Sequence, residues 1–171
     1  SDLKTYGFEV MAKISDESDQ GLFGWGSYTW TRSKVRSNMA TDDYADDWIN
    51  FWYDQTHVLK IVSGYTQNKH TVSARFQFNS SLPYTPIDET KEDADYSGPG
   101  KRYEIIGYKK TNSARLAPEH RLDLRYSYKT NYKWGFVNWY VEIINIYNFH
   151  NEEYFFNYST GQASVRKTKG L

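Results

Sequence analysis

The sequence contains no cysteine, so it has neither a disulfide framework nor a metal site built from thiolates. No apolar run approaches the roughly 18 residues that a transmembrane helix requires, and we therefore expect none. The opening residues, SDLKTYGFEV, lack the basic start and apolar core of a secretion signal and are not expected to be one. An excess of either charge is also lacking, since 21 Lys and Arg residues balance 21 Asp and Glu residues. This balance excludes a nucleic-acid partner chosen by net charge.

Aliphatic residues are scarce, but aromatic residues are plentiful. The mean hydropathy is −0.81, while 18% of the residues are aromatic, with 16 Tyr and 6 Trp. Tyrosine and tryptophan suit a boundary between lipid and water, because each ring has an apolar body and a polar group. They also suit a β-domain that binds carbohydrate. Composition leaves both interpretations open.

The most informative stretch is residues 115–148, because it alternates strictly between apolar and charged positions. Apolar side chains recur at every second position and share one face of a strand: Leu122, Leu124, Tyr126 and Tyr128. We expect a turn at residues 130–133, followed by a returning strand with Val137, Trp139, Val141 and Ile143 on one face. A soluble sandwich would bury this apolar face, whereas a membrane barrel would turn it to lipid. The pattern alone does not decide between them.

Four further strands are predicted at residues 6–15, 22–33, 57–65 and 71–79, with an additional extension at residues 103–108. The face assignment of residues 22–33 stays open, because large rings occupy both alternating sets. The connections alternate between short and long along the chain. That asymmetry is typical of outer-membrane barrels, which have tight periplasmic turns and long external loops. We therefore predict an all-β, antiparallel, up-and-down transmembrane β-barrel segment.

Four short motifs resemble TonB-dependent outer-membrane receptors. They are DQTH at residues 54–57, SSLPYTPI at 80–87, NSARLAPEHRLDL at 112–124 and INIYN at 144–148, in the order found in that family. Ser81 replaces the usual Gly and Ala117 the usual Pro. The resemblance implies that residues 1–171 are the C-terminal portion of a barrel of about twenty-two strands, comprising about six full strands and part of a seventh, without the plug domain.

The resemblance also implies a location and a function. The chain would form the wall and extracellular loops of a bacterial outer-membrane transporter that actively takes up a metal chelate, vitamin, glycan or peptide. Its partners would be the lipid bilayer, the remaining barrel strands, the plug and an inner-membrane energy-coupling protein. Two alternatives remain: a soluble β-sandwich that binds carbohydrate, and a structural or assembly barrel subunit without transport.

Candidate site residues fall into two groups. The ligand-contact candidates form an aromatic set: Trp48, Phe51, Trp52 and Tyr53. The same rings would also suit a girdle at the membrane boundary. The charged and polar positions opposite the apolar face would line the lumen and contact a plug or water: Arg75, Gln77, Arg121, Asp123, Arg125, Lys129 and Glu142.

Catalytic, metal-binding and cofactor-binding residues are not predicted, and we expect a protein that is not an enzyme. The acidic cluster Asp42, Asp43, Asp46 and Asp47 lacks the spacing and glycine of a calcium loop, which favours a solvated external loop. The four histidines show no pairing at metal spacing, and His57 and His120 each suit a hydrogen-bonded structural role. Glu152 and Glu153 are neighbours in a strand and point in opposite directions, which makes them a poor catalytic pair.

Overall fold

The structure is a computed structural model, and it describes residues 1–15, 20–36 and 47–168. Within these ranges the chain forms thirteen β-strands and no helix. Accordingly, none of these residues belongs to a helix that is long and apolar enough to cross a membrane. The expectation of an all-β antiparallel protein is confirmed.

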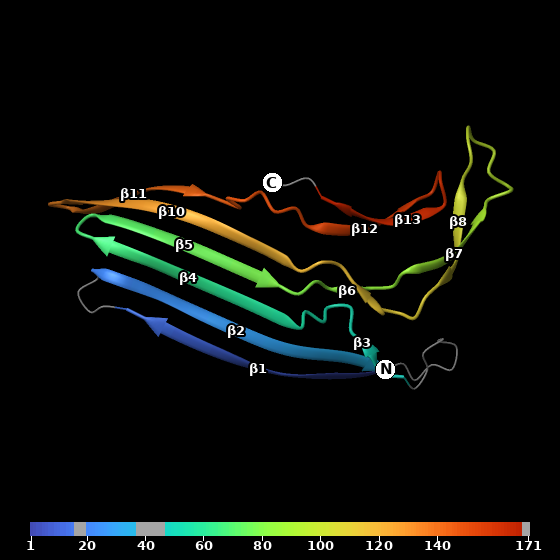
Figure 1. The fold of residues 1–171 in the computed structure, drawn as a ribbon, viewed down its shortest axis with the longest axis horizontal. Helices are drawn as coiled ribbons and strands as arrows, with labels where there is room; N and C mark the ends of the chain where they lie inside the picture. The colour runs from blue at the N-terminus through green and yellow to red at the C-terminus, as the bar shows by residue number, and fades with distance from the viewer. Residues whose placement is uncertain (16–19, 37–46, 169–171) are drawn as a thin grey trace.

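Six long antiparallel strands form the main sheet in the order β1-β2-β4-β5-β10-β11 (Figure 1). Their bounds are β1 (Asp2–Ile14), β2 (Gly21–Arg36), β4 (His57–Gln67), β5 (His70–Asn79), β10 (Glu119–Tyr132) and β11 (Gly135–Ile143). The two-residue strand β3 (Ile49–Asn50) pairs with the end of β2. Each long strand lies beside the long strand that precedes it in the sequence, as the up-and-down arrangement predicts. The described strands do not close into a barrel, because β1 pairs only with β2 and β11 only with β10.

The register places most of the apolar residues of the six strands on one side, which we call the apolar face. Directly opposed residues share a face, and Phe76 of β5 lies opposite both Ile61 and Leu122. The face comprises Tyr6, Phe8, Val10, Ala12, Ile14, Leu22, Tyr28, Trp30, Leu59, Ile61, Tyr65, Val72, Ala74, Phe76, Phe78, Leu122, Leu124, Tyr126, Tyr128, Val137, Trp139, Val141 and Ile143. We call the opposite side the polar face.

The register also settles the orientation of β2, which the alternation left open. Tyr28 lies opposite Val10 and Leu59 and so belongs to the apolar face. Trp25 lies opposite Lys13 and Val62, on the polar face. Rings therefore occur on both sides of this strand, which explains why its sequence pattern was ambiguous.

Tight turns occupy one end of the main sheet, which we call the turn end. Asn68 and Lys69 connect β4 to β5, and Lys133 and Trp134 connect β10 to β11. The predicted turn at residues 130–133 is wrong in its first three residues, because these pair with β11 as far as the Tyr132–Gly135 pair. Gly135 has a φ of 154°, a backbone conformation that residues with side chains rarely adopt, and the hairpin closes there.

The long connections lie at the opposite end, the loop end, and they contain small hairpins of their own. They comprise β6 (Pro83–Tyr84) with β9 (Ala114–Arg115), β7 (Ile87–Glu92) with β8 (Tyr103–Tyr108), and β12 (Glu152–Asn157) with β13 (Gln162–Lys167). The predicted strand at residues 103–108 is thereby confirmed. The expected part of a seventh long strand is not found among the described residues, because residues 152–167 form a separate two-stranded sheet.

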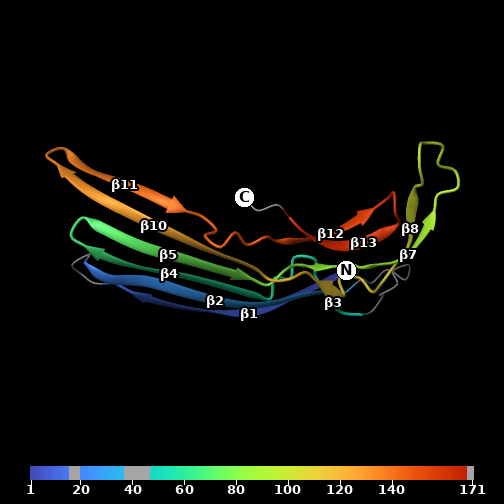
Figure 2. The same cartoon turned by 45° about the horizontal axis from the view of Figure 1, so that its top comes forward.

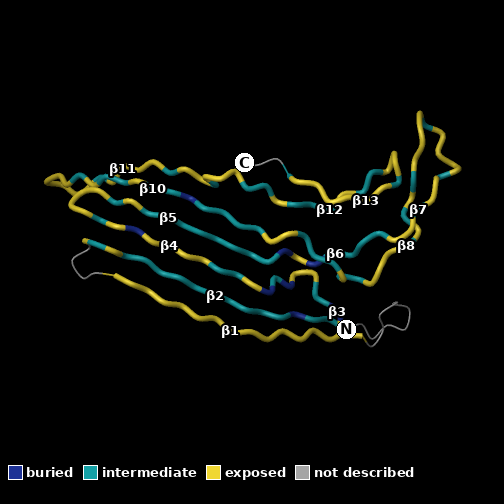
Figure 3. The backbone as a smooth tube through the Cα atoms, viewed as in Figure 1, coloured by how far each residue is buried: buried dark blue, intermediate teal, exposed yellow. Residues whose placement is uncertain are grey.

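The main sheet is a single layer with almost no hydrophobic core. The six long strands lie side by side, and the small hairpins gather at the loop end (Figures 1 and 2). Among the described residues only Ile49 is a buried hydrophobic residue, whereas Ser33, Asp54, Thr56, Ser81 and Asp123 are buried and polar (Figure 3). On the apolar face the exposed fractions reach 58% for Val72 and 68% for Val141. A soluble domain shows the reverse distribution.

Candidate functional site at the loop end of the sheet

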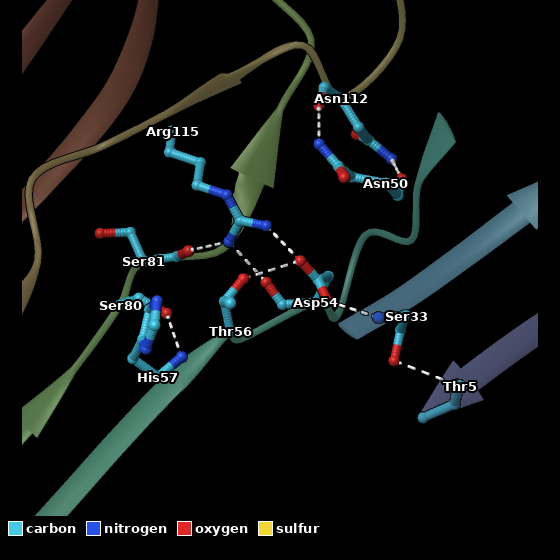
Figure 4. A network of polar contacts seen from close by, with 10 residues as sticks. All are labelled: Thr5, Ser33, Asn50, Asp54, Thr56, His57, Ser80, Ser81, Asn112 and Arg115. Carbon is cyan, nitrogen blue, oxygen red and sulfur yellow. Dashed lines mark hydrogen bonds and ion pairs between the residues drawn. The ribbon is translucent and has the colours of Figure 1, made fainter. Parts of the chain in front are cut away.

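A buried ion pair between Asp54 and Arg115 links the long connection before β4 to the long connection before β10 (Figure 4). The Asp54 carboxylate is 1% exposed. It accepts hydrogen bonds from the backbone N–H of Ser33 at 2.6 Å and from the hydroxyl of Thr56 at 3.0 Å. The Arg115 guanidinium also donates to the carbonyl oxygens of Asp54 at 2.6 Å and Ser81 at 2.8 Å. The charge of Asp54 is thus fully compensated, as a buried carboxylate requires.

Two further contacts reinforce this fastening. Asn50 and Asn112 exchange hydrogen bonds, from the side-chain amide of Asn50 to the Asn112 carbonyl at 3.2 Å and from the amide of Asn112 to the Asn50 carbonyl at 2.8 Å (Figure 4). The hydroxyl of Ser81 donates to the carbonyl oxygen of Ala117. Ser81 and Ala117 are the two positions at which the sequence departs from the family resemblance, and they contact each other.

The segment after β11 contacts the long connection between β5 and β10 through the hairpin β12–β13. The Tyr154 ring lies 4.5 Å from that of Tyr84, and its hydroxyl accepts the N–H of Ile87 at 2.8 Å. The Glu152 carboxylate accepts the N–H of Ala117 at 3.0 Å. The loop end is therefore a set of interlocked connections.

Asp123 is the second buried carboxylate, and it lies on the polar face near the loop end of β10. It is 1% exposed. Arg75 donates to one of its oxygens from Nε at 3.0 Å and from Nη2 at 2.7 Å, while the other oxygen accepts the N–H of Asn145 at 2.9 Å. Arg121 Nε is 3.1 Å from Asp123, and Glu142 is 3.7 Å from Arg75. The structure thus brings four of the predicted lumen-facing residues together.

The other predicted lumen-facing residues share the polar face without joining this cluster. Arg125 stacks on Tyr140, with 3.8 Å between its guanidinium carbon and the ring centroid, and Lys129 lies 4.8 Å from the ring centroid of Phe136. Gln77 lies opposite Lys60 and Arg121 in the register. The prediction that these side chains share one face is borne out by the register; whether that face lines a lumen stays a prediction.

Three of the four predicted ligand-contact residues form a compact group just before β4. Ring centroids are 6.0 Å apart for Phe51 and Trp52 and 4.6 Å apart for Trp52 and Tyr53. Trp52 is 58% exposed and Tyr53 is 62% exposed. Trp48 stands apart and stacks under Arg36 at 5.2 Å. Asp54 follows this group directly in the sequence, so its burial fixes the backbone that carries the rings.

Histidines pair with tyrosines at both ends of the sheet. His57 Nδ1 is 2.8 Å from the Tyr28 hydroxyl, His120 Nδ1 is 2.8 Å from that of Tyr147, and His70 Nδ1 is 2.7 Å from that of Tyr126. Burial and the negative charge of Asp123 raise the pKa of the Tyr147 hydroxyl. The hydrogen-bonded role predicted for His57 and His120 is confirmed. Three or more metal-binding side chains do not cluster anywhere in the described ranges.

The remaining acidic candidates have separate partners. Asp42, Asp43 and Asp46 lie outside the described residues, while Asp47 pairs with Lys110 at 2.9 Å. Glu153 binds Arg166 at 2.5 Å, whereas Glu152 binds the backbone of Ala117. The two glutamates therefore serve different contacts.

The sequence reasoning missed the pairing of Asp54 with Arg115. Its only signal was that Asp54, Ser81 and Arg115 fall within three of the quoted motifs. Comparison of the chain with protein-family models, with curated proteins and with solved structures finds no match.

Proposed function

We propose that the chain forms part of the wall and outer loops of a TonB-dependent transporter in a bacterial outer membrane. The observation that carries this proposal is the inverted burial of the sheet. The apolar face is the exposed one, whereas the buried side chains Ser33 and Asp123 lie on the polar face. In water such a sheet would be unfavourable, since each Å² of exposed apolar surface costs about 25 cal/mol. Lipid removes that cost.

The height of the apolar face supports a membrane location. Along β4 the apolar face runs from His57, which lies opposite Trp30 at the loop end, to Tyr65, which lies opposite Val72 near the turn end. Eight residue steps separate His57 from Tyr65, which is about 27 Å along a strand. The apolar band of an outer-membrane barrel is about 25 Å tall and is flanked by aromatic girdles.

The polar face and the sheet edges suggest the partners. Ion pairs and cation–π contacts on the polar face suit a water-filled lumen that a plug contacts. Among the described residues no strand pairs with the outer edge of β1 or of β11. Each unpaired backbone group at these edges would cost several kcal/mol in hydrocarbon. We propose that further barrel strands pair with both edges. An inner-membrane energy-coupling protein would drive uptake of a metal chelate, vitamin, glycan or peptide.

Spin labelling tests the membrane location, and the absence of native cysteine makes each label unique. Nitroxides are attached at Val72→Cys and Val141→Cys on the apolar face, with Ser73→Cys and Asn138→Cys as controls on the polar face. After reconstitution in bilayers, we expect oxygen to relax the first pair and a water-soluble nickel chelate to relax the second. Equal access of the nickel chelate to all four labels would overturn the proposal, as would a stable monomer in buffer without detergent.

Transport has its own test. Cells that lack this protein and cells that lack the energy-coupling protein should show the same uptake defect for one nutrient among the four classes. An intact uptake profile after loss of this protein would leave a structural or assembly role.

A further inference from the structure

A row of cations continues the apolar face at the loop end of β1 and β2. Strand β2 pairs with β4 only as far as Trp30, and residues 31–36 extend beyond that point beside β1 (Figure 1). Because alternate residues of a strand share a face, the positions in line with Tyr6 and Trp30 lie on the side of the apolar face. Four of these positions are basic, and we call them the basic stripe: Lys4, Arg32, Lys34 and Arg36.

Charge at this level is confined to one side of the sheet. The alternate positions of residues 2–6 and 31–36 point to the opposite side, and all of them are uncharged: Leu3, Thr5, Thr31, Ser33 and Val35. Asp2 is the only acidic residue in these two segments, and it pairs with Arg36 at 2.7 Å. The stripe therefore carries a clear excess of positive charge within these segments.

The register also places two cations directly opposite each other. Lys4 of β1 pairs with Lys34 of β2, and like charges at directly opposed positions destabilise an antiparallel pair. Among the described residues, no hydrogen bond or ion pair engages the charged groups of Lys4, Arg32 or Lys34. An anion bound between Lys4 and Lys34 would replace this repulsion with attraction. The arrangement therefore indicates an anionic ligand.

Aromatic rings beside the stripe indicate that this ligand belongs to a lipid. Lys4 Nζ lies 5.9 Å from the ring centroid of Tyr6, whose ring lies 5.7 Å from that of Trp30. The guanidinium carbon of Arg36 lies 5.2 Å from the ring centroid of Trp48. Tyrosine and tryptophan are enriched at the level of lipid headgroups, and basic side chains near them reach lipid phosphates.

The length of the stripe indicates the kind of headgroup. Arg32, Lys34 and Arg36 lie two, four and six residue steps beyond Trp30, which is about 7, 13 and 20 Å along the strand. A strand tilt of about 40° reduces the last height to about 15 Å. The interfacial layer of an ordinary bilayer is only about 5–8 Å deep on each side. A headgroup with a single phosphate would therefore reach only the lower part of the stripe.

We propose that the basic stripe binds a lipid whose headgroup carries more than one phosphate, in the leaflet at the loop end. The proposal rests on the proposed function, because the acyl chains would lie against the apolar face below Tyr6 and Trp30. One phosphate would lie between Lys4 and Lys34. The guanidinium of Arg32 would bind a phosphate through two parallel N–H donors.

Native mass spectrometry of the full protein in a nonionic detergent tests the proposal. The probes are diphosphorylated lipid A, its monophosphorylated form and phosphatidylcholine. We expect the diphosphorylated form to bind most tightly and phosphatidylcholine least tightly. Lys34→Gln and Arg32→Gln should each weaken binding of the diphosphorylated form about fivefold, the effect of one cation near an anionic lipid surface. Lys13→Gln, which lies on the polar face near the turn end of β1, should leave binding unchanged.

Circular dichroism of each variant verifies the sheet, so weaker binding by a folded variant reports on the stripe. Equal affinity for the three lipids would overturn the proposal, and this result is expected if carboxylates of the chain itself, such as those of Asp42, Asp43 and Asp46, occupy the stripe. Equal binding by Lys34→Gln, Arg32→Gln and Lys13→Gln would also overturn it, as would displacement of the lipid by an equal concentration of inorganic phosphate.

The spin-label experiment in bilayers is independent of this result. Apolar-face labels that lie in lipid, together with no preference for the diphosphorylated form, would remove only the phosphate site. Apolar-face labels that are open to the nickel chelate would remove the membrane location itself.

Discussion

At the scale of single residues, the loop end depends on one guanidinium. Arg115 serves the Asp54 carboxylate and two backbone carbonyls. Arg115→Ala leaves a buried charge uncompensated, and we expect it to lower the free energy of unfolding by about 3–5 kcal/mol. Urea unfolding from bilayers measures this loss.

Lys110→Ala is the matched control for that measurement. It breaks an ion pair with Asp47 in which both side chains are exposed, and it should cost about 0–1 kcal/mol. Equal losses for the two variants would show that the Asp54 network is not a stabilising centre.

Tyr147 gives the loop end a dependence on alkaline pH. Its pKa in the folded protein is raised above that of the unfolded chain. The stability that results is fully present below the ordinary tyrosine pKa of about 10, and it is lost as the pH rises through the folded value. Tyr147→Phe should therefore show a shallower alkaline decline in the free energy of unfolding. A decline as steep as that of the parent protein would contradict this assignment.

Prediction from sequence was least successful for contacts between individual residues. Alternation placed Arg75 and Asp123 on one face, and the register then made them neighbours. Nothing in a local pattern paired Asp54 with Arg115, because 61 positions separate them and the contact depends on how two loops fold back.

At the scale of elements, close approach between β2 and β4 restricts two glycines differently. A Cβ added to Gly24 would lie 2.6 Å from the carbonyl oxygen of Val62, whereas one added to Gly26 meets nothing closer than 3.8 Å. Both positions are on the apolar face of one strand. Gly24→Ala should cost about 1–3 kcal/mol, because backbone must move. Gly26→Ala should stay within about 0.5 kcal/mol of the parent protein.

Unfolding of both glycine variants under the same conditions provides the measurement. Equal stability of the two would mean that β2 and β4 are farther apart than the register requires.

Strands whose residues alternate strictly between apolar and polar were predictable from sequence, whereas the other elements were not. In β5, β10 and β11 the pattern identified both the strand and its apolar face. In β2 it failed, because Trp25 and Tyr28 put rings on opposite faces. The β10–β11 turn was misplaced, since polar residues suggested a turn while Gly135 provided the required backbone conformation.

At the scale of the whole molecule, the two edges of the sheet determine what surrounds it. If other strands flank β1 and β11, their amides should exchange with deuterium as slowly as those of β4 and β5 in the membrane-inserted protein. Hydrogen exchange followed by mass spectrometry measures this directly. Fast exchange along either edge, with slow exchange in the centre, would show that this edge has no neighbour.

The order of the six long strands was predictable from the alternation of short and long connections. The arrangement of the loop end was not, because the hairpins β6–β9 and β12–β13 are held by contacts between distant segments. Sequence patterns therefore predicted the main sheet, whereas the contacts that join its loops were apparent only in the structure.

The near absence of buried hydrophobic residues, with Ile49 alone in the described ranges, has a calorimetric consequence. Unfolding a globular domain raises the heat capacity by about 12–15 cal/mol/K per residue, because buried hydrocarbon becomes hydrated. In this sheet the apolar side chains are already exposed, so unfolding in water would newly hydrate little apolar surface. Scanning calorimetry of the chain without lipid should therefore record a heat-capacity change far below that range. The full change should appear only when the sheet is surrounded by lipid acyl chains before it unfolds.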